Sequence, residues 1–363
     1  RDLAEVREAI DGLPAPQMVF AAATHFTPQG NFRPTGGVPR EIHVLHRGNI
    51  LDPRDPAAPA ALAVLDHAPA LFELPEGHSE GDRRIALANW VAHSENPLTW
   101  RSIVNRVWQH HFGRGLVDTP SDFGRMGASP THPELIDWLA ATFRDGGGSL
   151  KDLHRLICGS ATYRQASRVT DASRNLRIDK DNRFLWKQNR RRLEAEAVRD
   201  AVLFVSGKLD LTPYGPGFQD FVIDKPEHSP HYEYHLHDPD DPRSHRRAVY
   251  RFVVRSQQQP FMTTLDCADP SMQVDKRNET VTPLQALAML NNDLMVAMSR
   301  HFASRLEAHH ATAEERITAA IELALGRSPG EEELAALVSC AEEHGLENAC
   351  RVIFNLNEFV FVD

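Results

Sequence analysis

The sequence predicts a mainly α protein: a multi-helix domain with a short irregular β element and a proline-rich, extended N-terminal arm. Apolar residues recur at spacings of three and four in segment after segment from residue 82 onward, as in amphipathic helices. Proline, alanine and glycine are instead concentrated in residues 14–75, where they break regular structure. A chain of 363 residues, 41% hydrophobic and 25% charged, suits one large or two medium globular domains.

The N-terminal part, residues 1–81, is predicted to be the end of an upstream domain followed by a connector. Residues 1–13 have the pattern of the tail of a helix, and residues 18–23 and 42–45 are short extended runs. We expect residues 39–48 to belong to a strand pair, and residues 53–59 to form a flexible or polyproline-like connector. Residues 82–363 are then the main helical domain.

The densest run of specific residue choices covers residues 96–139. A helix is predicted to follow Asn96-Pro97, with one apolar stripe that has His111 at its middle and with Asn105 and Arg106 on the opposite side. Gly113 suits a left-handed C-cap. The next helix is predicted to begin at a capping box formed by Thr131 and Glu134.

Further segments complete the prediction. Residues 247–255 have the pattern of a strand that places Arg251 and Arg255 on one face, and residues 266–270 that of a turn. A helix capped by Ser149 is expected to turn Leu153, Leu156 and Ile157 inward. The remaining predicted helices are residues 193–205, closed by Gly207, and residues 283–306, 313–325, 346–356 and a segment that starts at 331.

Several motifs carry a resemblance to a known family. They are Asn105-Arg106-x-Trp108, Phe112-Gly113-Arg114-Gly115, Thr119-Pro120-x-Asp122-Phe123-Gly124, His132-Pro133-Glu134-Leu135-x-Asp137-Trp138-Leu139 and Asn189-Arg190-Arg191-Arg192-Leu193-x-Ala195-Glu196. In these residues the chain resembles the planctomycete-specific domain of unknown function. That domain stands at the C-terminal end of large secreted proteins, which often carry a cytochrome-c-like domain near the N-terminus and another domain of unknown function in the middle.

The resemblance implies an extracytoplasmic location, in the periplasm or at the cell surface. It also implies that the partners are the upstream cytochrome-c-like and middle domains of the same precursor, where a c-type haem would lie. None of the four cysteines of this chain stands in a CxxC or CxxCH arrangement, so we expect neither a zinc knuckle nor a haem attachment here. A disulfide between Cys340 and Cys350 is left open by the count alone.

The charge balance bears on the ligands. A net charge of -10 argues against a general nucleic-acid binder, and no apolar run approaches the ~20 residues that span a bilayer. Arg190, Arg191 and Arg192 are nevertheless consecutive. Arginine suits fixed contacts to oxygen pairs, either on internal carboxylates or on anionic ligands.

Histidines between residues 228 and 237 form the first candidate site. His231, His235 and His237 with Asp238 could offer three imidazoles and a carboxylate to a divalent metal. The alternative is a polar loop in which histidines pair with carboxylates. Only residues 229–232 of this segment belong to the resemblance, which makes His231 the better single candidate.

Arginines and polar partners form the second candidate site. If loop, strand and turn converge, their side chains would line a cationic cleft suited to sulfate, phosphate or uronate groups. The alternative is an internal ion-pair network that fixes a loop-rich fold. The substrate-binding candidates are Asn105, Arg106, Arg125, Arg251, Arg255 and Asp266, and Asp122 and Arg277 belong to the same set.

The third candidate site is catalytic in form. His110 with Asp118 or Asp122 could act as a histidine–carboxylate pair, with Ser121 nearby. No serine stands in a G-x-S-x-G motif, so a hydrolase elbow is unsupported. The catalytic candidates are therefore His110, Asp122 and His231.

Two functions follow from these patterns. One is a module of a secreted, cytochrome-linked protein that takes part in the processing of polysaccharide, including sulfated polysaccharide. The other is a non-enzymatic surface or scaffold domain that binds glycan or protein. The first hypothesis is favoured by the arginine-lined polar loops and by the other domains that occur in the same precursor proteins. No catalytic residue can be derived from the sequence.

Overall fold

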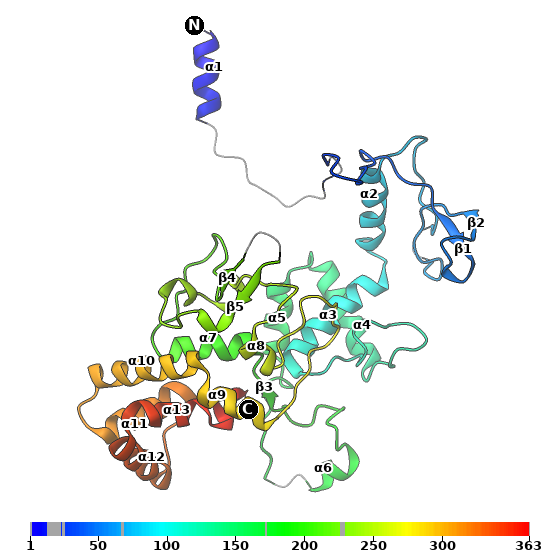
Figure 1. Ribbon diagram of the computed structural model, residues 1–363. Helices are drawn as coiled ribbons and strands as arrows, with labels where there is room; N and C mark the ends of the chain where they lie inside the picture. Colours follow the sequence, from blue (N-terminus) through cyan, green and yellow to red (C-terminus); the bar gives the residue numbers. More distant parts are fainter. Residues whose placement is uncertain are drawn as a thin grey trace. The chain divides into compact units, whose positions relative to one another are not determined.

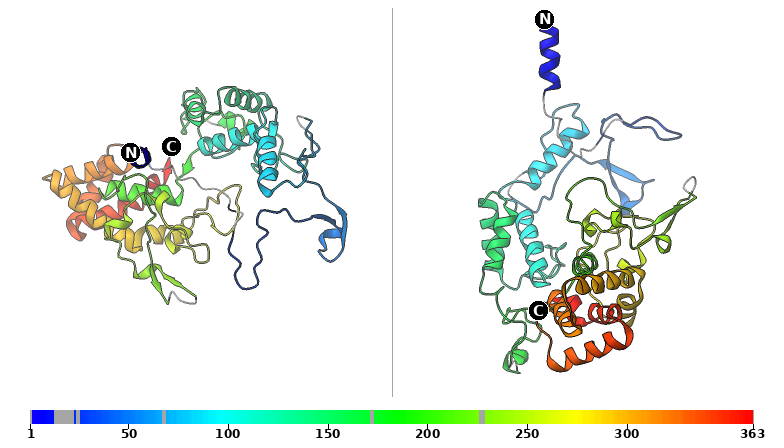
Figure 2. Two further views of the ribbon diagram at one scale, coloured as in Figure 1. Left: turned by 90° about the horizontal axis from the view of Figure 1, so that it is seen from above. Right: turned by 90° about the vertical axis from the view of Figure 1, so that its left-hand side faces the viewer.

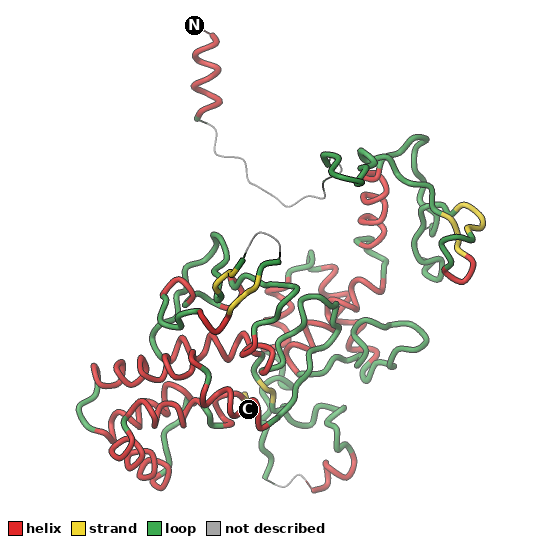
Figure 3. The backbone as a smooth tube through the Cα atoms, in the orientation of Figure 1, coloured by secondary structure: helices red, strands yellow, loops and turns green. Residues whose placement is uncertain are grey.

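Helices dominate the computed structural model, which describes residues 2–12, 23, 26–66, 69–170, 173–225 and 229–362 (Figures 1 and 3). These residues contain fourteen α-helices, and their strands form only two-stranded antiparallel sheets. The predicted mainly α fold is confirmed. The chain falls into two units, Arg1–Trp100 and Arg101–Asp363, and each is described by itself.

The first unit contains α1 (Asp2–Asp11), β1 (His43–Leu45), the 3-10 helix η1 (His46–Gly48), β2 (Pro53–Pro56) and α2 (Glu80–Val91). The predicted strand pair is present, because β1 pairs with β2. The connector predicted at residues 53–59 is wrong, since its first four residues are β2. Prolines are tolerated there because the two-stranded sheet has only edge strands, where a missing N–H need not face a partner. The extended run predicted at residues 18–23 lies outside the described residues except for residue 23.

A polar loop connects α3 (Pro97–Phe112) to α4 (Pro133–Asp145), and α5 (Leu150–Cys158) follows. The apolar stripe of α3 is confirmed, since its buried residues include Val104, Val107, Trp108 and Phe112. Gly113 has the expected left-handed conformation, with φ of 79°. Of the residues predicted inward on α5, two are buried, but Leu156 is 38% exposed.

Asn105 contradicts the prediction that it lies opposite the buried stripe. It is fully buried, accepts a hydrogen bond from the Val117 N–H (2.8 Å) and donates one to the Val117 carbonyl (2.9 Å). The loop folds back over this face of α3, so a polar residue is covered and satisfied. Gly115 is required there, because a Cβ would stand 2.5 Å from the Val117 carbonyl oxygen.

The capping box predicted at Thr131 and Glu134 is also wrong. His132 is the N-cap of α4 and provides no side-chain cap, while the Thr131 hydroxyl donates to the Leu116 carbonyl (3.3 Å). Thr131 thus closes the base of the loop rather than the end of the helix. Pro133 does occupy the first turn.

A C-terminal helical bundle carries the main apolar core. It comprises α7 (Ala195–Val205), α8 (Pro260–Thr264), α9 (Pro283–Asn291), α10 (Asp293–His309), α11 (Ala313–Leu325), α12 (Glu331–His344), α13 (Leu346–Phe354) and α14 (Asn357–Val360). Its orange and red helices stay together in two further views (Figure 2). The single helix predicted at residues 283–306 is wrong, because Asn292 is extended, ends α9 and caps α10 by accepting from the Leu294 N–H.

Short elements connect these helices. They are α6 (Ser173–Ile178), β3 (Arg191–Arg192), β4 (Val222–Asp224), β5 (His231–Glu233), β6 (Phe361–Val362), η2 (Tyr234–Leu236), η3 (Pro242–Ser244) and η4 (Ala248–Tyr250). Strand β3 pairs with β6, and β4 pairs with β5. The strand predicted at residues 247–255 is wrong, because η4 occupies its first half. Only Arg251 there makes a bridge, with Phe218.

The four cysteines, all described, are free thiols, so the disulfide that the count left open between Cys340 and Cys350 is not formed. Among the described helices, none combines the length and the apolar composition needed to cross a lipid bilayer.

Candidate functional site

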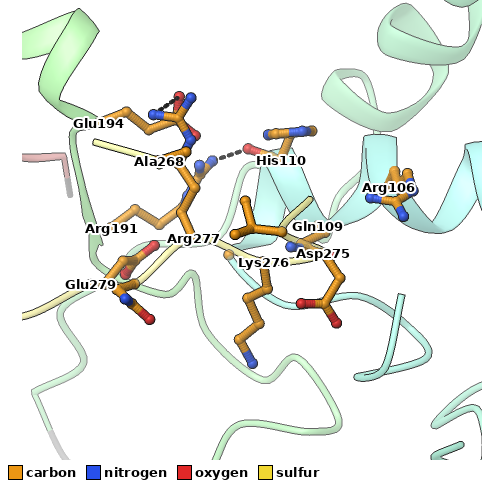
Figure 4. Close-up of a pocket in the computed structure, with 13 residues that line it drawn as sticks. Arg106, Gln109, His110, Arg191, Glu194, Ala268, Asp275, Lys276, Arg277 and Glu279 are labelled. Carbon is orange, nitrogen blue, oxygen red and sulfur yellow. Dashed lines mark hydrogen bonds and ion pairs between the residues drawn. The ribbon is translucent and has the colours of Figure 1, made fainter. Parts of the chain in front are cut away.

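A cavity of about 560 Å³ lies at the C-terminal end of α3. Its walls come from three segments far apart in the sequence: the last turn and a half of α3 with Gly113, the stretch from β3 to the start of α7, and residues 274–279 between α8 and α9. Figure 4 shows Arg106, Gln109 and His110 on the α3 side and Asp275, Lys276 and Arg277 on another wall. We call this cavity the arginine groove.

Among the described residues, two cations of the groove, Arg106 and Arg191, have no carboxylate partner, and only Arg106 is bound through a side-chain hydroxyl. The Nη2 of Arg106 donates to the Ser121 hydroxyl (3.0 Å), and the side chain is half-buried. A neutral hydroxyl leaves the guanidinium charge uncompensated. Arg106 is therefore able to donate further charge-assisted hydrogen bonds to an anion.

Arg191 connects the groove with the end of α3. Its Nη1 donates to the carbonyl of His110 and to that of His111 (3.1 Å), and Figure 4 shows the contact with His110. These carbonyls have no partner inside the helix, and a cation is favourable at the negative end of the helix dipole. The Nε of Arg191 is buried and makes no hydrogen bond. Arg191 therefore fixes this wall and has one donor left over.

Arg277 on the facing wall is held by two acids. Its Nη1 is 2.6 Å from a Glu196 carboxylate oxygen and 3.8 Å from one of Glu194. Burial is the largest single effect and works to raise the pKa of Glu196, but the hydrogen bond and charge of Arg277, with a backbone hydrogen bond and the Cys267 thiol, together hold that pKa below its usual value. The Cys267 thiol donates to Glu196 (3.6 Å), and its pKa is raised by burial and by this carboxylate. Cys267 thus stays a protonated thiol at neutral pH, which argues against a nucleophilic role.

Residues 274–279 are held by polar contacts just after the segment and within it. Asp266, which has φ of 65°, accepts from Arg192 (3.0 Å), from the Thr280 N–H (2.8 Å) and from Gln285 (3.0 Å). Within the segment Lys276 lies 3.4 Å from Asp118 of the loop that follows α3. The segment is thereby held opposite α3 without an apolar core of its own.

A second cavity of about 470 Å³ shares His110, Arg191 and Glu194 with the arginine groove. We call it the Tyr163 cavity, because Tyr163 lines it together with Gln188, whose buried Oε1 has no hydrogen-bond partner. His111 also lines it and forms a hydrogen bond between its Nε2 and Nδ1 of His154 (2.8 Å). Burial, followed by the charges of His154 and Arg191, lowers the pKa of His111. The two cavities adjoin at His110, Arg191 and Glu194, and of these three residues Arg191 has a buried donor without a partner.

The structure brings together only some of the residues predicted to bind substrate. Arg106 and Arg277 line the same groove. Asn105 is buried behind it, Asp266 anchors the adjoining segment, and Arg251 lies 3.8 Å from Asp220. Arg125 and Arg255 are exposed and do not line the groove.

The residues predicted to be catalytic or to bind a metal lie in different parts of the structure. His110 is exposed at the groove, whereas Asp122 accepts from the Gly124 N–H (2.8 Å) within its own loop. His231 is exposed on β5, His235 pairs with Glu233 (3.3 Å), and His237 is half-buried. In the part of the chain that the structure describes, no three His, Cys, Asp or Glu side chains are arranged to hold a metal ion, and His228 lies outside that part. Metal binding at His231 stays a prediction.

The profile of a family described as PSD1, protein of unknown function (DUF1553), matches residues 83–341. The chain belongs to this family. The PSD1 match covers every wall of the arginine groove and most of the helical bundle. Neither the curated proteins nor the solved structures contain a match to the chain.

Sequence reasoning missed Arg191 and Lys276 as members of the site. Arg191 was recognisable as part of the Arg190–Arg192 run, which could pair internally or with an anionic ligand. That Arg191 donates to backbone carbonyls could not be predicted, because these contacts depend on where α3 ends relative to β3. Lys276 was not named although it directly precedes Arg277, because the prediction considered arginines and carboxylates only.

Proposed function

We propose that this PSD1 domain binds an anionic polysaccharide, such as a sulfated or uronate-containing one, in the arginine groove. In this proposal it is a module of a secreted, cytochrome-linked protein that processes such polysaccharide. The single observation that carries the proposal is Arg106, a guanidinium in a large open cavity whose described partner is a neutral hydroxyl. Guanidinium groups match the paired oxygens of sulfate and carboxylate.

The shape of the site supports a chain-like ligand. The arginine groove and the Tyr163 cavity share three lining residues, so a ligand can extend from one into the other. Arg191 and Gln188, which line that path, each carry a buried polar atom without a hydrogen-bond partner. Sugar hydroxyls and acidic groups supply the complementary partners.

A scaffold function is the second candidate, and one observation favours it. Arg277 is paired with Glu196 and Lys276 with Asp118, so much of the charge in the groove already stabilises the segment 274–279. In that reading the domain holds neighbouring domains or a protein at the cell surface. The two functions differ in whether Arg106 matters for ligand affinity.

The test measures binding of a sulfated oligosaccharide of defined length, and of its desulfated counterpart, by calorimetry at low and high salt. We expect the sulfated ligand to bind and the affinity to fall as salt rises, because exposed charges are screened. Arg106→Gln should weaken binding by about tenfold, which corresponds to the loss of one charge-assisted contact. Arg125→Gln removes the same charge from the neighbouring exposed loop and should leave the affinity unchanged.

Two results would reject the proposal. One is equal binding of the sulfated and desulfated ligands. The other is an equal loss of affinity in both variants, which would indicate a diffuse charge effect instead of a site. No binding of any oligosaccharide by a folded domain would favour the scaffold function.

A further inference from the structure

Asp220 is a buried carboxylate whose hydrogen bonding is incomplete. Its side chain is 9% exposed, and its Oδ1 makes no hydrogen bond to any described residue. The nearest cation is Nη1 of Arg251, which lies 3.8 Å from that oxygen, an ion-pair distance too long for a hydrogen bond. A buried acceptor without a partner destabilises the folded protein, so its retention calls for an explanation.

Arg199 is close to Asp220 but donates its hydrogen bonds to other groups. It is 4% exposed, and its guanidinium donates to the carbonyls of Ser244 and Arg246 and lies 4.9 Å from the ring centre of Phe218. Burial lowers the pKa of Arg199 to about 10, with Asp220 and Asp200 opposing that effect. Arg199 therefore stays charged at neutral pH and builds the wall next to Asp220 without completing its hydrogen bonds.

Asp220 lines a cavity of about 180 Å³, which we call the Asp220 cavity. A single water needs only roughly 10–15 Å³ of such space, so one ordered water does not fill it. The other walls include Tyr234, His237, Gln259, Phe261 and Asn292. Apolar surface from Phe261 beside several amide and hydroxyl groups is the usual lining of a small-molecule site.

The charge state of the lining favours a neutral ligand. Burial raises the pKa of Asp220 even though Arg251 and Arg199 oppose it. Burial also lowers the pKa of His237, with Asp220, Asp241 and Asp238 opposing, so both groups are pushed toward their uncharged forms. With two arginines and several acids already close by, neither an added cation nor an added anion gains a clear electrostatic advantage.

We propose that the Asp220 cavity binds one neutral, hydroxyl-bearing unit, such as a single sugar residue, whose hydroxyl donates a hydrogen bond to the Asp220 carboxylate. This site is separate from the arginine groove, because the two cavities have no lining residue in common. The proposal does not depend on the anionic-glycan function. The Asp220 cavity would give the domain a second carbohydrate-binding site, which recognises hydroxyl groups instead of charged groups.

The test uses saturation-transfer NMR with methyl glucoside and methyl galactoside as neutral probes and methyl glucuronoside as the anionic comparison. We expect the wild-type protein to bind at least one neutral glycoside more tightly than the anionic one. Asp220→Leu, which removes the acceptor and keeps a similar volume, should reduce that affinity at least tenfold. Asp224→Leu, an exposed aspartate on β4, is the matched control and should bind like wild type.

Asp220→Asn covers the case in which the leucine variant does not fold. Hydrogen bonds to a carboxylate are about twice as strong as those to a neutral acceptor, so this variant should bind several-fold more weakly. The proposal is overturned if no neutral glycoside binds the wild type, or if wild type and both folded Asp220 variants bind equally. Arg106→Gln should leave glycoside binding intact, which separates the failure of this site from that of the arginine groove.

Discussion

The C-terminal helical bundle and the arginine groove are stabilised by different forces. In the bundle, Phe302 and Phe354 are fully buried and stacked, with ring centres 5.5 Å apart, among apolar residues from eight helices. In the groove, irregular segments are fixed by Arg191 on helix carbonyls and by the contacts of Asp266 and Lys276. Apolar burial in the bundle therefore supplies the stability of the domain, whereas polar contacts in the groove hold charged side chains at a surface.

A change in the bundle should have the largest effect on stability. Phe302→Ala removes a fully buried ring and leaves a cavity, so we expect the free energy of unfolding to fall by about 3–5 kcal/mol. Urea unfolding followed by circular dichroism measures this loss. Ligand affinity of the molecules that remain folded should not change, and a loss of affinity at constant fold would break the separation between the two regions.

Asn105 tests the boundary between the regions. Asn105→Ala leaves the buried N–H and carbonyl of Val117 without partners, so we expect a loss of roughly 2–4 kcal/mol. The same unfolding experiment measures it, and Gln109→Ala, at a half-buried position of the same helix, serves as the control. A loss below that of the control would show that the loop does not depend on this residue.

Arg191 should have a smaller effect on stability and a clear effect on the groove. Arg191→Ala removes two hydrogen bonds to the end of α3, which are worth about 1–2 kcal/mol together. The melting temperature reports this change. If Arg191 only caps the helix, affinity for the sulfated oligosaccharide will be unchanged, whereas our account expects it to fall.

Asp220 should make the free energy of unfolding depend on pH. Its pKa in the folded protein is raised above the ordinary value of 3.8, so the folded state holds the proton over a range where the unfolded state has lost it. Stability contributed by the protonated form is therefore lost as pH rises from 3.8 through the raised pKa. The difference in unfolding free energy between wild type and Asp220→Asn should thus shift in favour of the variant as pH rises. A difference that is constant with pH would contradict this assignment.

Periodicity predicted the parts of the fold that apolar burial controls. The stripe of α3 and helices α7, α11 and α13 follow from spacing alone, because each turns one apolar face to the core. The break at Asn292 and the helical turn at residues 248–250 were not predictable in this way. Both depend on local capping and on neighbouring segments that override a continuous apolar pattern.

The candidate site was predictable in kind and only in part in detail. Arg106 and Arg277 could be named because the guanidinium group suits anions. Asn105 was assigned to the wrong side, since the loop that covers it returns from twelve residues further along the chain. Asp220 gave no signal at all, because its lack of a partner arises only from the way residues 199, 237 and 251 meet around it.

Hydrogen-exchange mass spectrometry with and without the sulfated oligosaccharide tests the central claim most directly. We predict that ligand binding slows backbone amide exchange in residues 106–113 and 274–279 and leaves exchange in helices α10 to α13 unchanged. Those helices provide an internal reference, since they contribute core residues to the bundle and none of their residues lines the groove. Slower exchange confined to segments outside the groove, with residues 274–279 unaffected, would contradict the assignment of the arginine groove as the binding site.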